Sequence, residues 1–375
     1  KKIINFMRSF FISLIITLIL FFSIDLIAGN QILNYLYSYE IIQSPEQKRK
    51  ILDKIKKKEK SYRIKNQFFH HTLKPNTKIE SDWGGIKYIT CTDEYGFRSS
   101  CQSIGKKDTK NSIVIIGDSF TEGLGYDYNK TFAGMFDGYK SSKVYNMAVI
   151  SYSPIIYYNK IKYYIDNGLS IKHVIVFIDI TDIDDEANVY QKCKNNNFVC
   201  EKKELSKNFT KDRKIEKVIY FPIFKKLQEE VKNIKRLIKP KNYIYRKNFH
   251  RSSWTHIEQN EEINEGIKNS LKYMTKLYDY LNKNNITLSV GIYPHPGQIL
   301  FDKVNSKQVS IWREFCKLKC KYFIDLFPIF FEDKGKIDDM KIIKKFFIRN
   351  DIHCSEIGNR KIFDEIKDYE FGAEE

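Results

Sequence analysis

The chain has 375 residues, of which 42% are hydrophobic and 29% charged, as in a sizeable globular domain with attached segments. Its formal net charge is +18, and residues 187–251 hold 19 Lys or Arg against 6 Asp or Glu. Such an excess suits nucleic acid, anionic lipid or an acidic polymer, or it is the solvated face of a Lys- and Asn-rich chain. The sequence contains no recognisable nucleic-acid-binding module, so we expect no nucleic-acid partner.

An apolar segment stands near the start of the chain. Residues 9–29, SFFISLIITLILFFSIDLIAG, carry a single charge, Asp25, and are about long enough to cross ~30 Å of hydrocarbon as a helix. A cleaved signal peptide would have a shorter apolar core and a small-x-small cleavage site, which Leu26-Ile27-Ala28 matches poorly. We therefore expect an uncleaved transmembrane signal anchor at 9–29.

The flanking charges predict how this anchor is oriented. Lys1, Lys2 and Arg8 precede it, and neither Lys nor Arg occurs from 9 to 47. By the positive-inside rule residues 1–8 stay in the cytoplasm. The basic run at 48–65 argues mildly for the opposite orientation but begins far from the span. We expect a single-pass inner-membrane protein whose body is periplasmic or otherwise extracytoplasmic.

Beyond the anchor, residues 30–109 are expected to form a charged helical stalk to about 65 and then a membrane-proximal segment without clear periodicity. From 110 to 370 short Val- and Ile-rich runs alternate with helical patterns. The expected strands are 112–117, 143–149, 173–180, 286–293 and 321–327, and the expected helices are 154–167, 262–282, 304–318 and 355–367. Strands that are apolar on both faces and alternate with helices predict an α/β fold with a parallel sheet covered on both sides. A basic, partly helical insertion is expected at about 184–260.

Seven cysteines fit an exported protein. Cys91 with Cys101, and Cys193 with Cys200, each flank a short loop that a disulfide could close. Cys316 and Cys320 are four residues apart in a helical pattern, a spacing expected to point the side chains poorly for a disulfide. Cys354 is left over by count. None of the spacings is CxxC, so we expect no zinc site.

Candidate catalytic residues lie at the two ends of the α/β region. Ser119 follows the first strand in IVIIGDSFTEGLG, where the turn and the next helix would offer N–H groups to a developing negative charge. For Ser119 taken alone, the commoner explanation is the N-cap of the next helix. His353 has a carboxylate, Asp351, two residues before it, and that spacing would orient its ring toward Ser119.

GDSFTEGLG and DIHCSEIGN resemble the first and last sequence blocks of the SGNH (GDSL-type) hydrolases, and DEYGFRS at 93–99 resembles an element of their membrane-anchored bacterial members. The resemblance covers about 110–369. It implies a flavodoxin-like three-layer α/β/α sandwich that cleaves or transfers acyl groups. It also implies Ser119 as nucleophile, His353 as general base and then acid, and Asp351 as its orienter. The Asp-x-x-His spacing of many members would instead put Asn350 in the place of the acid.

The resemblance also points to an oxyanion hole with two departures from the family. Its donors would be the Ser119 N–H, Ser151 where the family has Gly, and Thr181 where it has Asn. A Thr hydroxyl reaches less far than an Asn amide, and a lost donor costs ~3–4 kcal/mol of transition-state stabilisation. Nearby carboxylates would repel an oxyanion if they pointed inward: Asp182, Asp184 and Asp185.

The sequence thus predicts an extracytoplasmic serine esterase or O-acyltransferase without cofactor or metal. Family analogy and compartment suggest an acylated cell-envelope glycan or small ester as substrate, and a membrane acyl-donor protein as a further partner. The alternative is a catalytically weakened scaffold that binds glycans or aids assembly. Of the remaining histidines, His295 is expected to pack structurally or to line the pocket, and His70, His71, His250 and His256 to lie on the surface. The acidic run DITDIDDE lacks the Gly and Glu of a calcium loop.

Overall fold

The computed structural model describes residues 2–38, 62–102, 108–190, 221–238, 247, 251–257 and 261–371. The chain divides into two compact units. One comprises Lys1–Lys58 with Lys202–Pro240, and the other comprises Glu59–Glu201 with Lys241–Glu375. The predicted stalk lies largely outside the described residues, as does most of the predicted insertion.

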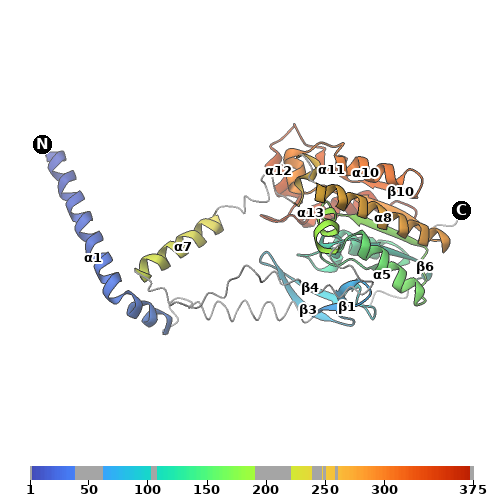
Figure 1. Ribbon diagram of the computed structural model, residues 1–375, viewed down its shortest axis with the longest axis horizontal. Coiled ribbons are helices and arrows are strands. Elements are labelled where there is room, and N and C mark those ends of the chain that lie inside the picture. The colour runs from blue at the N-terminus through green and yellow to red at the C-terminus, as the bar shows by residue number, and fades with distance from the viewer. Residues whose placement is uncertain are drawn as a thin grey trace. The chain divides into compact units, whose positions relative to one another are not determined.

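The second unit is built on an eight-stranded sheet with the strand order β10-β9-β8-β6-β7-β5-β4-β3 (Figure 1). The five strands predicted from the sequence pair in parallel, in the order typical of flavodoxin-like folds. They are β6 (Asp108–Ile116), β7 (Ser142–Asn146), β8 (His173–Ile178), β9 (Thr287–Ile292) and β10 (Tyr322–Asp325). Every residue of β8 is buried, as expected for a strand covered on both faces. The predicted α/β fold is confirmed.

Helices cover both faces of this sheet (Figure 1). α5 packs against α8 and α4 against α13, and right-handed crossovers place these two pairs on opposite faces. The longer helices are α4 (Phe132–Tyr139), α5 (Pro154–Asp166), α8 (Glu261–Lys283), α10 (Lys307–Cys316), α12 (Asp339–Phe346) and α13 (Glu356–Ile366). The short ones are α3 (Ser119–Glu122), η1 (Tyr128–Lys130), α6 (Asp182–Asp185), the π-helical η2 (Glu186–Tyr190), η3 (Ser253–Thr255), α9 (Pro296–Phe301) and α11 (Phe327–Phe331).

The segment before the first parallel strand is more ordered than its sequence indicates. It forms β1 (Arg63–Asn66), β2 (His70–Leu73), β3 (Lys78–Trp83), β4 (Ile86–Thr92) and β5 (Arg98–Ser99). β1 and β2 form a separate hairpin, whereas β3, β4 and β5 extend the main sheet as antiparallel strands beside β7. These strands are short and half-exposed, so their burial alternates without a strong apolar run.

Two disulfides lie in this unit. Cys91–Cys101 links β4 to the chain just after β5, as the sequence suggested. Cys316–Cys320 also forms a disulfide, so the expectation that their side chains point apart was wrong. The reason is that α10 ends at Cys316 and the chain turns there, which leaves the Cα atoms 4.7 Å apart. Cys193 and Cys200 lie outside the described residues.

The first unit contains α1 (Lys2–Ser38) and α7 (Pro222–Ile238). Residues 6–36 of α1 are long and apolar enough to cross a membrane, a property that signal sequences share. The helix extends beyond the predicted span of 9–29 at both ends. α7 packs against α1 within this unit.

Candidate active site

Ser119 follows β6, the first parallel strand along the chain, which lies between β8 and β7, and is the first residue of α3. The preceding Asp118 caps this helical turn by accepting a hydrogen bond from Phe120 N. A Cβ at Gly117 would lie 2.3 Å from Thr121 Oγ1 and 2.7 Å from Phe177 O, so only glycine lets the turn pass this close to β8. The Ser119 side chain is buried at the sheet edge where ligands of open α/β sheets bind.

Asp351 and His353 lie in a tight turn between α12 and α13. Asn350 adopts a left-handed conformation with φ +59°, and Ile348 N donates to His353 O over 2.8 Å. This turn brings Asp351 Oδ1 within 3.0 Å of His353 N and 2.5 Å of His353 Nδ1. Asp351, and not Asn350, therefore contacts the imidazole, because Asn350 forms the bend.

The structure joins Ser119, His353 and Asp351 in one chain of hydrogen bonds. His353 Nε2 lies 2.9 Å from Ser119 Oγ, on the side of the ring opposite to Asp351. Burial raises the pKa of Asp351, but the hydrogen bond and charge of His353 outweigh it and lower the pKa to about 2. The carboxylate is therefore ionised at neutral pH and favours the tautomer with the proton on Nδ1, which leaves Nε2 to accept from Ser119.

Trp83 is a site residue that the sequence did not reveal. Its Nε1–H donates to Asp351 Oδ2 over 3.2 Å, and its ring meets the His353 ring edge-on with 5.1 Å between centroids. Trp83 ends β3 at a two-glycine turn, Gly84-Gly85, both of whose residues have positive φ. The sequence shows a Trp before a Gly-Gly turn, but it could not show that this Trp contacts Asp351, 268 residues away.

Asp118 takes part in the site as well as in the turn. Its Oδ2 lies 3.0 Å from Ser119 Oγ, and its Oδ1 accepts from Tyr293 OH over 3.1 Å. Burial, with the charge of Asp179, raises the pKa of Asp118 to about 6. Ser119 Oγ therefore lies between two proton acceptors, His353 and Asp118.

Ser151 has a backbone conformation that glycine favours. Its φ is +62°, the left-handed region that glycine favours, and its N–H has no hydrogen-bond acceptor among the described residues. Glu122 holds the loop by accepting from Ile150 N over 2.7 Å. Tyr190 OH donates to Ser151 O. The loop thus keeps a glycine-type backbone with a free donor although its residue is serine.

Glu122 and His71 were not expected in this region. Glu122 is fully buried, and Arg63 donates to both of its carboxylate oxygens, over 2.9 and 2.6 Å. His71 is half-buried and its Nε2 lies 2.8 Å from Ile150 O, so the expectation that it is a surface residue was wrong. Burial lowers the pKa of His71 to about 4. Arg63 and His71 come from β1 and β2, so the unrecognised strands support the Ser151 loop.

Thr181 lies near Asp179 at the end of β8, but its hydroxyl has an acceptor. Thr181 Oγ1 donates to Asp179 Oδ1 over 2.6 Å, and its backbone N–H donates to the same oxygen over 2.7 Å. The hydroxyl has one proton, which this arrangement directs to Asp179. The Thr181 hydroxyl would have to rotate away from Asp179 to serve an oxyanion.

His295 forms a second buried histidine–carboxylate pair beside the site. Its Nε2 lies 2.7 Å from Asp179 Oδ2, and its ring stacks on Phe120, the residue after Ser119. Burial raises the pKa of Asp179, but the charge and hydrogen bond of His295 prevail and lower it to about 2. His295 Nδ1 is buried without a partner among the described side chains. The pair gives the buried Asp179 carboxylate a hydrogen-bond partner.

The acidic residues after Thr181 do not leave unpaired charges in the site. Asp182 accepts from Tyr157 OH over 2.7 Å, and burial raises its pKa well above the ordinary value, which favours the neutral acid. Asp184 and Asp185 form ion pairs with Arg251, at 3.1 and 2.7 Å. The expected repulsion of an oxyanion is thereby reduced.

Among the described residues, the carboxylates of Asp118, Asp179 and Asp182 lie near enough to one another to share a cation. Each of the three already accepts hydrogen bonds from protein donors: Ser119 and Tyr293, Thr181 and His295, and Tyr157 respectively. A cation would have to share most of these oxygens with their donors, whereas Asp182 Oδ1 has no partner among the described residues. The three carboxylates form part of a hydrogen-bonded network.

No family model matches this sequence, and no curated protein matches it. Among solved structures it is similar to a lipolytic protein of the G-D-S-L family from Veillonella parvula DSM 2008, at 12% identity and a TM-score of 0.36, covering 68% of this chain and 94% of that one. A putative G-D-S-L lipolytic protein from Desulfitobacterium hafniense DCB-2 has 12% identity, a TM-score of 0.37 and coverages of 68% and 98%. The esterase EstA of a Pseudoalteromonas species has 11% identity, a TM-score of 0.35 and coverages of 69% and 95%. These likenesses are remote, and the chemistry of the site rests on this chain's own residues.

Proposed function

We propose that this protein is a serine esterase or O-acyltransferase that works through an acyl-serine intermediate. The observation that carries the proposal is the buried hydrogen-bond chain from Ser119 Oγ to His353 and on to Asp351. A serine hydroxyl becomes a useful nucleophile when an oriented base removes its proton, and these three groups have the geometry for that step.

In the proposed reaction His353 Nε2 takes the Ser119 proton as Oγ bonds to the ester carbonyl carbon. The tetrahedral oxyanion collapses, the bond to the leaving alcohol breaks, and His353 returns the proton to that alcohol. The acyl group remains on Ser119. Water for hydrolysis, or a sugar hydroxyl for transfer, then loses its proton to His353, attacks the acyl carbon and releases Ser119, which regains the proton.

The oxyanion would be held by backbone donors. Ser119 N stands at the start of α3, where the first N–H groups lack intrahelical acceptors, and Ser151 N is free in a loop fixed from several sides. Thr181 is the third proposed donor, once its hydroxyl leaves Asp179. Asp351 and Trp83 act through His353 and are positioning residues.

The proposed setting is extracytoplasmic, with α1 as an anchor in the inner membrane and the body in the periplasm. The length and apolarity of α1 support this, and so do the two disulfides, which persist in oxidising compartments. An acylated cell-envelope glycan is the proposed substrate on the grounds of compartment and family resemblance. In the transferase form a membrane protein would have to deliver the acyl donor.

A fluorophosphonate probe tests the chemistry directly, because it phosphonylates an activated serine. We expect the full-length protein in detergent to be labelled, Ser119→Ala not to be labelled, and His353→Ala to be labelled at least a hundredfold more slowly. Full labelling of His353→Ala would refute the assignment.

A second candidate is a catalytically weakened scaffold that binds glycans. The bond from Thr181 Oγ1 to Asp179 favours it, because it occupies the donor that stands in for the family's Asn. A pair of variants separates the candidates. If Thr181 donates to the oxyanion, Thr181→Val should label about a hundredfold more slowly, since one lost donor costs ~3 kcal/mol. Thr181→Asn should label at least as fast as the wild type. Absence of Ser119-dependent labelling in all three proteins would favour the scaffold.

A further inference from the structure

Asp25 is the one charged residue in the predicted span, and the structure gives it a partner. Its carboxylate is buried, and its two oxygens accept hydrogen bonds from Ile223 N and Phe224 N, each over 2.8 Å. These are among the first N–H groups of α7, which have no intrahelical acceptors. Asp25 therefore caps α7 from another helix, and the cap satisfies a carboxylate that would be costly among lipid chains.

The contact between the two helices is closely fitted. A Cβ at Gly29 would lie 2.2 Å from Asp25 Oδ1 and 2.8 Å from Pro222 Cγ, so the missing side chain makes room for the start of α7. Phe22, one turn before Asp25, packs edge-on against Phe221 and Phe224, with centroid distances of 5.3 and 5.1 Å. Phe22, Asp25 and Gly29 share one face of α1 because they are three and four residues apart.

α7 presents an apolar face that α1 contacts at Phe224 and that stays largely exposed among the described residues. Phe224, Leu227 and Val231 lie on one side of the helix and are 37%, 51% and 47% exposed. The same spacing continues in the sequence to Ile234 and Ile238. The helix also carries five Lys or Arg against two Glu, which gives it an excess of positive charge. An exposed apolar stripe with a cationic opposite side is typical of helices that lie in a membrane interface.

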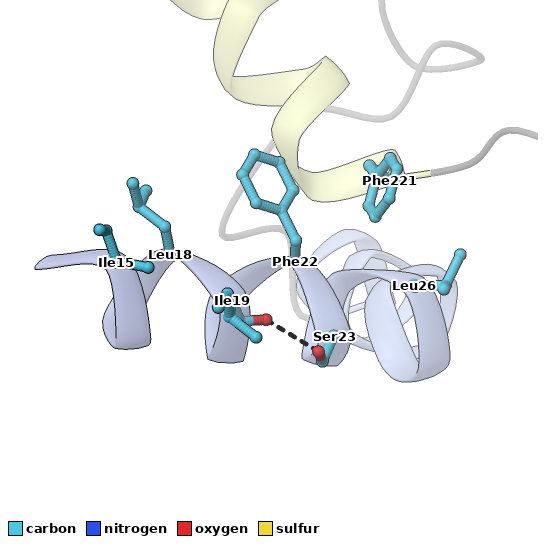
Figure 2. A pocket seen from close by; sticks show the side chains of 7 residues that line it. All are labelled: Ile15, Leu18, Ile19, Phe22, Ser23, Leu26 and Phe221. Atoms are coloured by element: carbon cyan, nitrogen blue, oxygen red, sulfur yellow. Dashed lines mark hydrogen bonds between the residues drawn. The ribbon is translucent and has the colours of Figure 1, made fainter. Parts of the chain in front are cut away.

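The apolar surface of α7 is continuous with that of α1. Figure 2 shows Phe221, the residue before α7, beside Phe22 at a groove of about 380 Å³ that is lined otherwise by aliphatic residues of α1 and Ser23. Asp25 lies 16 residues beyond Ser9, or about 24 Å along a helix rising ~1.5 Å per residue, so it falls near the far side of ~30 Å of hydrocarbon. The contact thus fixes the start of α7 at the depth of the membrane interface.

We propose that α7 is an interfacial helix that lies on an anionic phospholipid surface, held at its first turn by Asp25 of the anchor. The apolar stripe faces the acyl chains and the basic side faces the headgroups. The inference rests on α1 spanning the membrane and is independent of the chemistry at Ser119. It also makes α1 a permanent part of the folded protein, because cleavage after the apolar segment would remove the cap of α7.

Quenching by brominated lipids tests the proposal in the full-length protein, reconstituted in vesicles of phosphatidylcholine and phosphatidylglycerol brominated at carbons 6 and 7. Leu227→Trp places an indole on the apolar stripe, and Glu229→Trp places one on the opposite side of the same helix. We expect the fluorescence added by Leu227→Trp to be quenched at least twofold more strongly than that added by Glu229→Trp. Equal quenching, or none at either position, would overturn the proposal, and quenching of Leu227→Trp that appears only when the protein is diluted with lipid would show that a second copy covers the stripe.

Two measurements separate docking from anchoring. The first uses Phe221→Trp, whose indole reports the groove beside α1. We expect adding Asp25→Leu to this variant to reduce the quenching of that indole at least twofold, because α7 loses its cap while the span becomes more apolar. Unchanged quenching would refute docking through Asp25. The second measurement is extraction with alkaline carbonate, and release of the protein from the vesicles would refute anchoring by α1. Serine labelling by the fluorophosphonate should be the same in all these variants, so their outcome is distinct from that of the esterase test.

Discussion

At the residue scale, Ser119 Oγ lies between two buried groups that compete for its proton. His353 Nε2 is 2.9 Å away and Asp118 Oδ2 is 3.0 Å away. A proton directed to Asp118 leaves the hydroxyl unreactive, and a proton directed to His353 prepares it for attack. Asp118 also fixes the turn through Phe120 N and Tyr293 OH, so one carboxylate shapes the site and tunes it.

Replacement of Asp118 is expected to change how stability depends on pH. The pKa of Asp118 is raised from 3.8 to about 6 in the folded chain, so the folded state holds this proton more tightly than the unfolded state. Its contribution to stability is full below about pH 4 and is lost as pH rises through 6, an effect of about 3 kcal/mol at 1.36 kcal/mol per pKa unit. In Asp118→Asn this loss should disappear.

Urea unfolding of Asp118→Asn and wild type at pH 4 and pH 7 measures the difference. We expect the free energy of unfolding of the variant, measured relative to that of wild type, to be about 2–3 kcal/mol higher at pH 7 than at pH 4. Parallel changes in the two proteins would show that Asp118 does not titrate in this range.

Trp83 is expected to matter through its single hydrogen bond to Asp351. Trp83→Phe keeps an aromatic ring against His353 but removes the Nε1–H donor. A hydrogen bond to a charged group is worth about 1.5–3 kcal/mol, so fluorophosphonate labelling should slow about tenfold or more without loss of the fold. Trp83→Ala should slow it further, since both contacts are lost. An unchanged rate for Trp83→Phe would mean that Asp351 is held well enough by His353 and its own turn.

At the element scale, the strands before β6 connect the nucleophile's surroundings to the sheet. β3 and β4 carry Trp83 to the site, and Arg63 of β1 and His71 of β2 support the Ser151 loop through Glu122 and Ile150. The Cys91–Cys101 disulfide closes the β4–β5 segment. These strands are thus part of the candidate active site and not merely a connection to the anchor.

Loss of this disulfide should therefore affect both stability and labelling. A link closing a loop of about ten residues contributes about 3 kcal/mol in the chain-entropy account. We expect Cys91→Ala/Cys101→Ala to lower the melting temperature and, by loosening the strands that carry Trp83, to slow labelling several-fold. Cys316→Ala/Cys320→Ala is the matched control, because that link lies at the end of α10 and should lower stability alone. Equal labelling rates in both double variants would show that the Cys91–Cys101 disulfide does not support the site.

At the scale of the whole molecule, the chain comprises an α/β unit and a unit of two packed helices. The unit of two helices holds the only helix among the described residues that is long and apolar enough to cross a membrane. The disulfides of the α/β unit and the charges before α1 support the proposed orientation, with the α/β unit outside the cytoplasm.

Reporter fusions test that orientation. We expect alkaline phosphatase fused to the C-terminus and expressed in a Gram-negative bacterium to be active, because it needs the oxidising periplasm. A green fluorescent protein exported through the same fusion point should remain dark. The reverse pattern would place the body in the cytoplasm and contradict the positive-inside assignment.

The hydrophobic pattern of the sequence predicted strands and helices well where their residues are fully buried, and poorly where they are half-exposed. The five parallel strands and helices α5, α8, α10 and α13 were found to within a few residues, since their apolar runs and periods are strong. β3, half-exposed along its length, has no such run and was missed. The Cys316–Cys320 pairing was misjudged because the helical spacing ends where α10 ends.

The sequence by itself determined the α/β class, the apolar helix and the pairing of Asp351 with His353, because each depends on neighbours within a few residues. Only the tertiary structure decided what surrounds Ser119. Trp83, Asp179 with His295, and Glu122 with Arg63 meet across 59 to 268 residues, distances over which no local pattern constrains the chain. The tertiary structure also explained why an apolar span contains Asp25. This carboxylate caps two N–H groups of α7, which lies some 200 positions later in the chain.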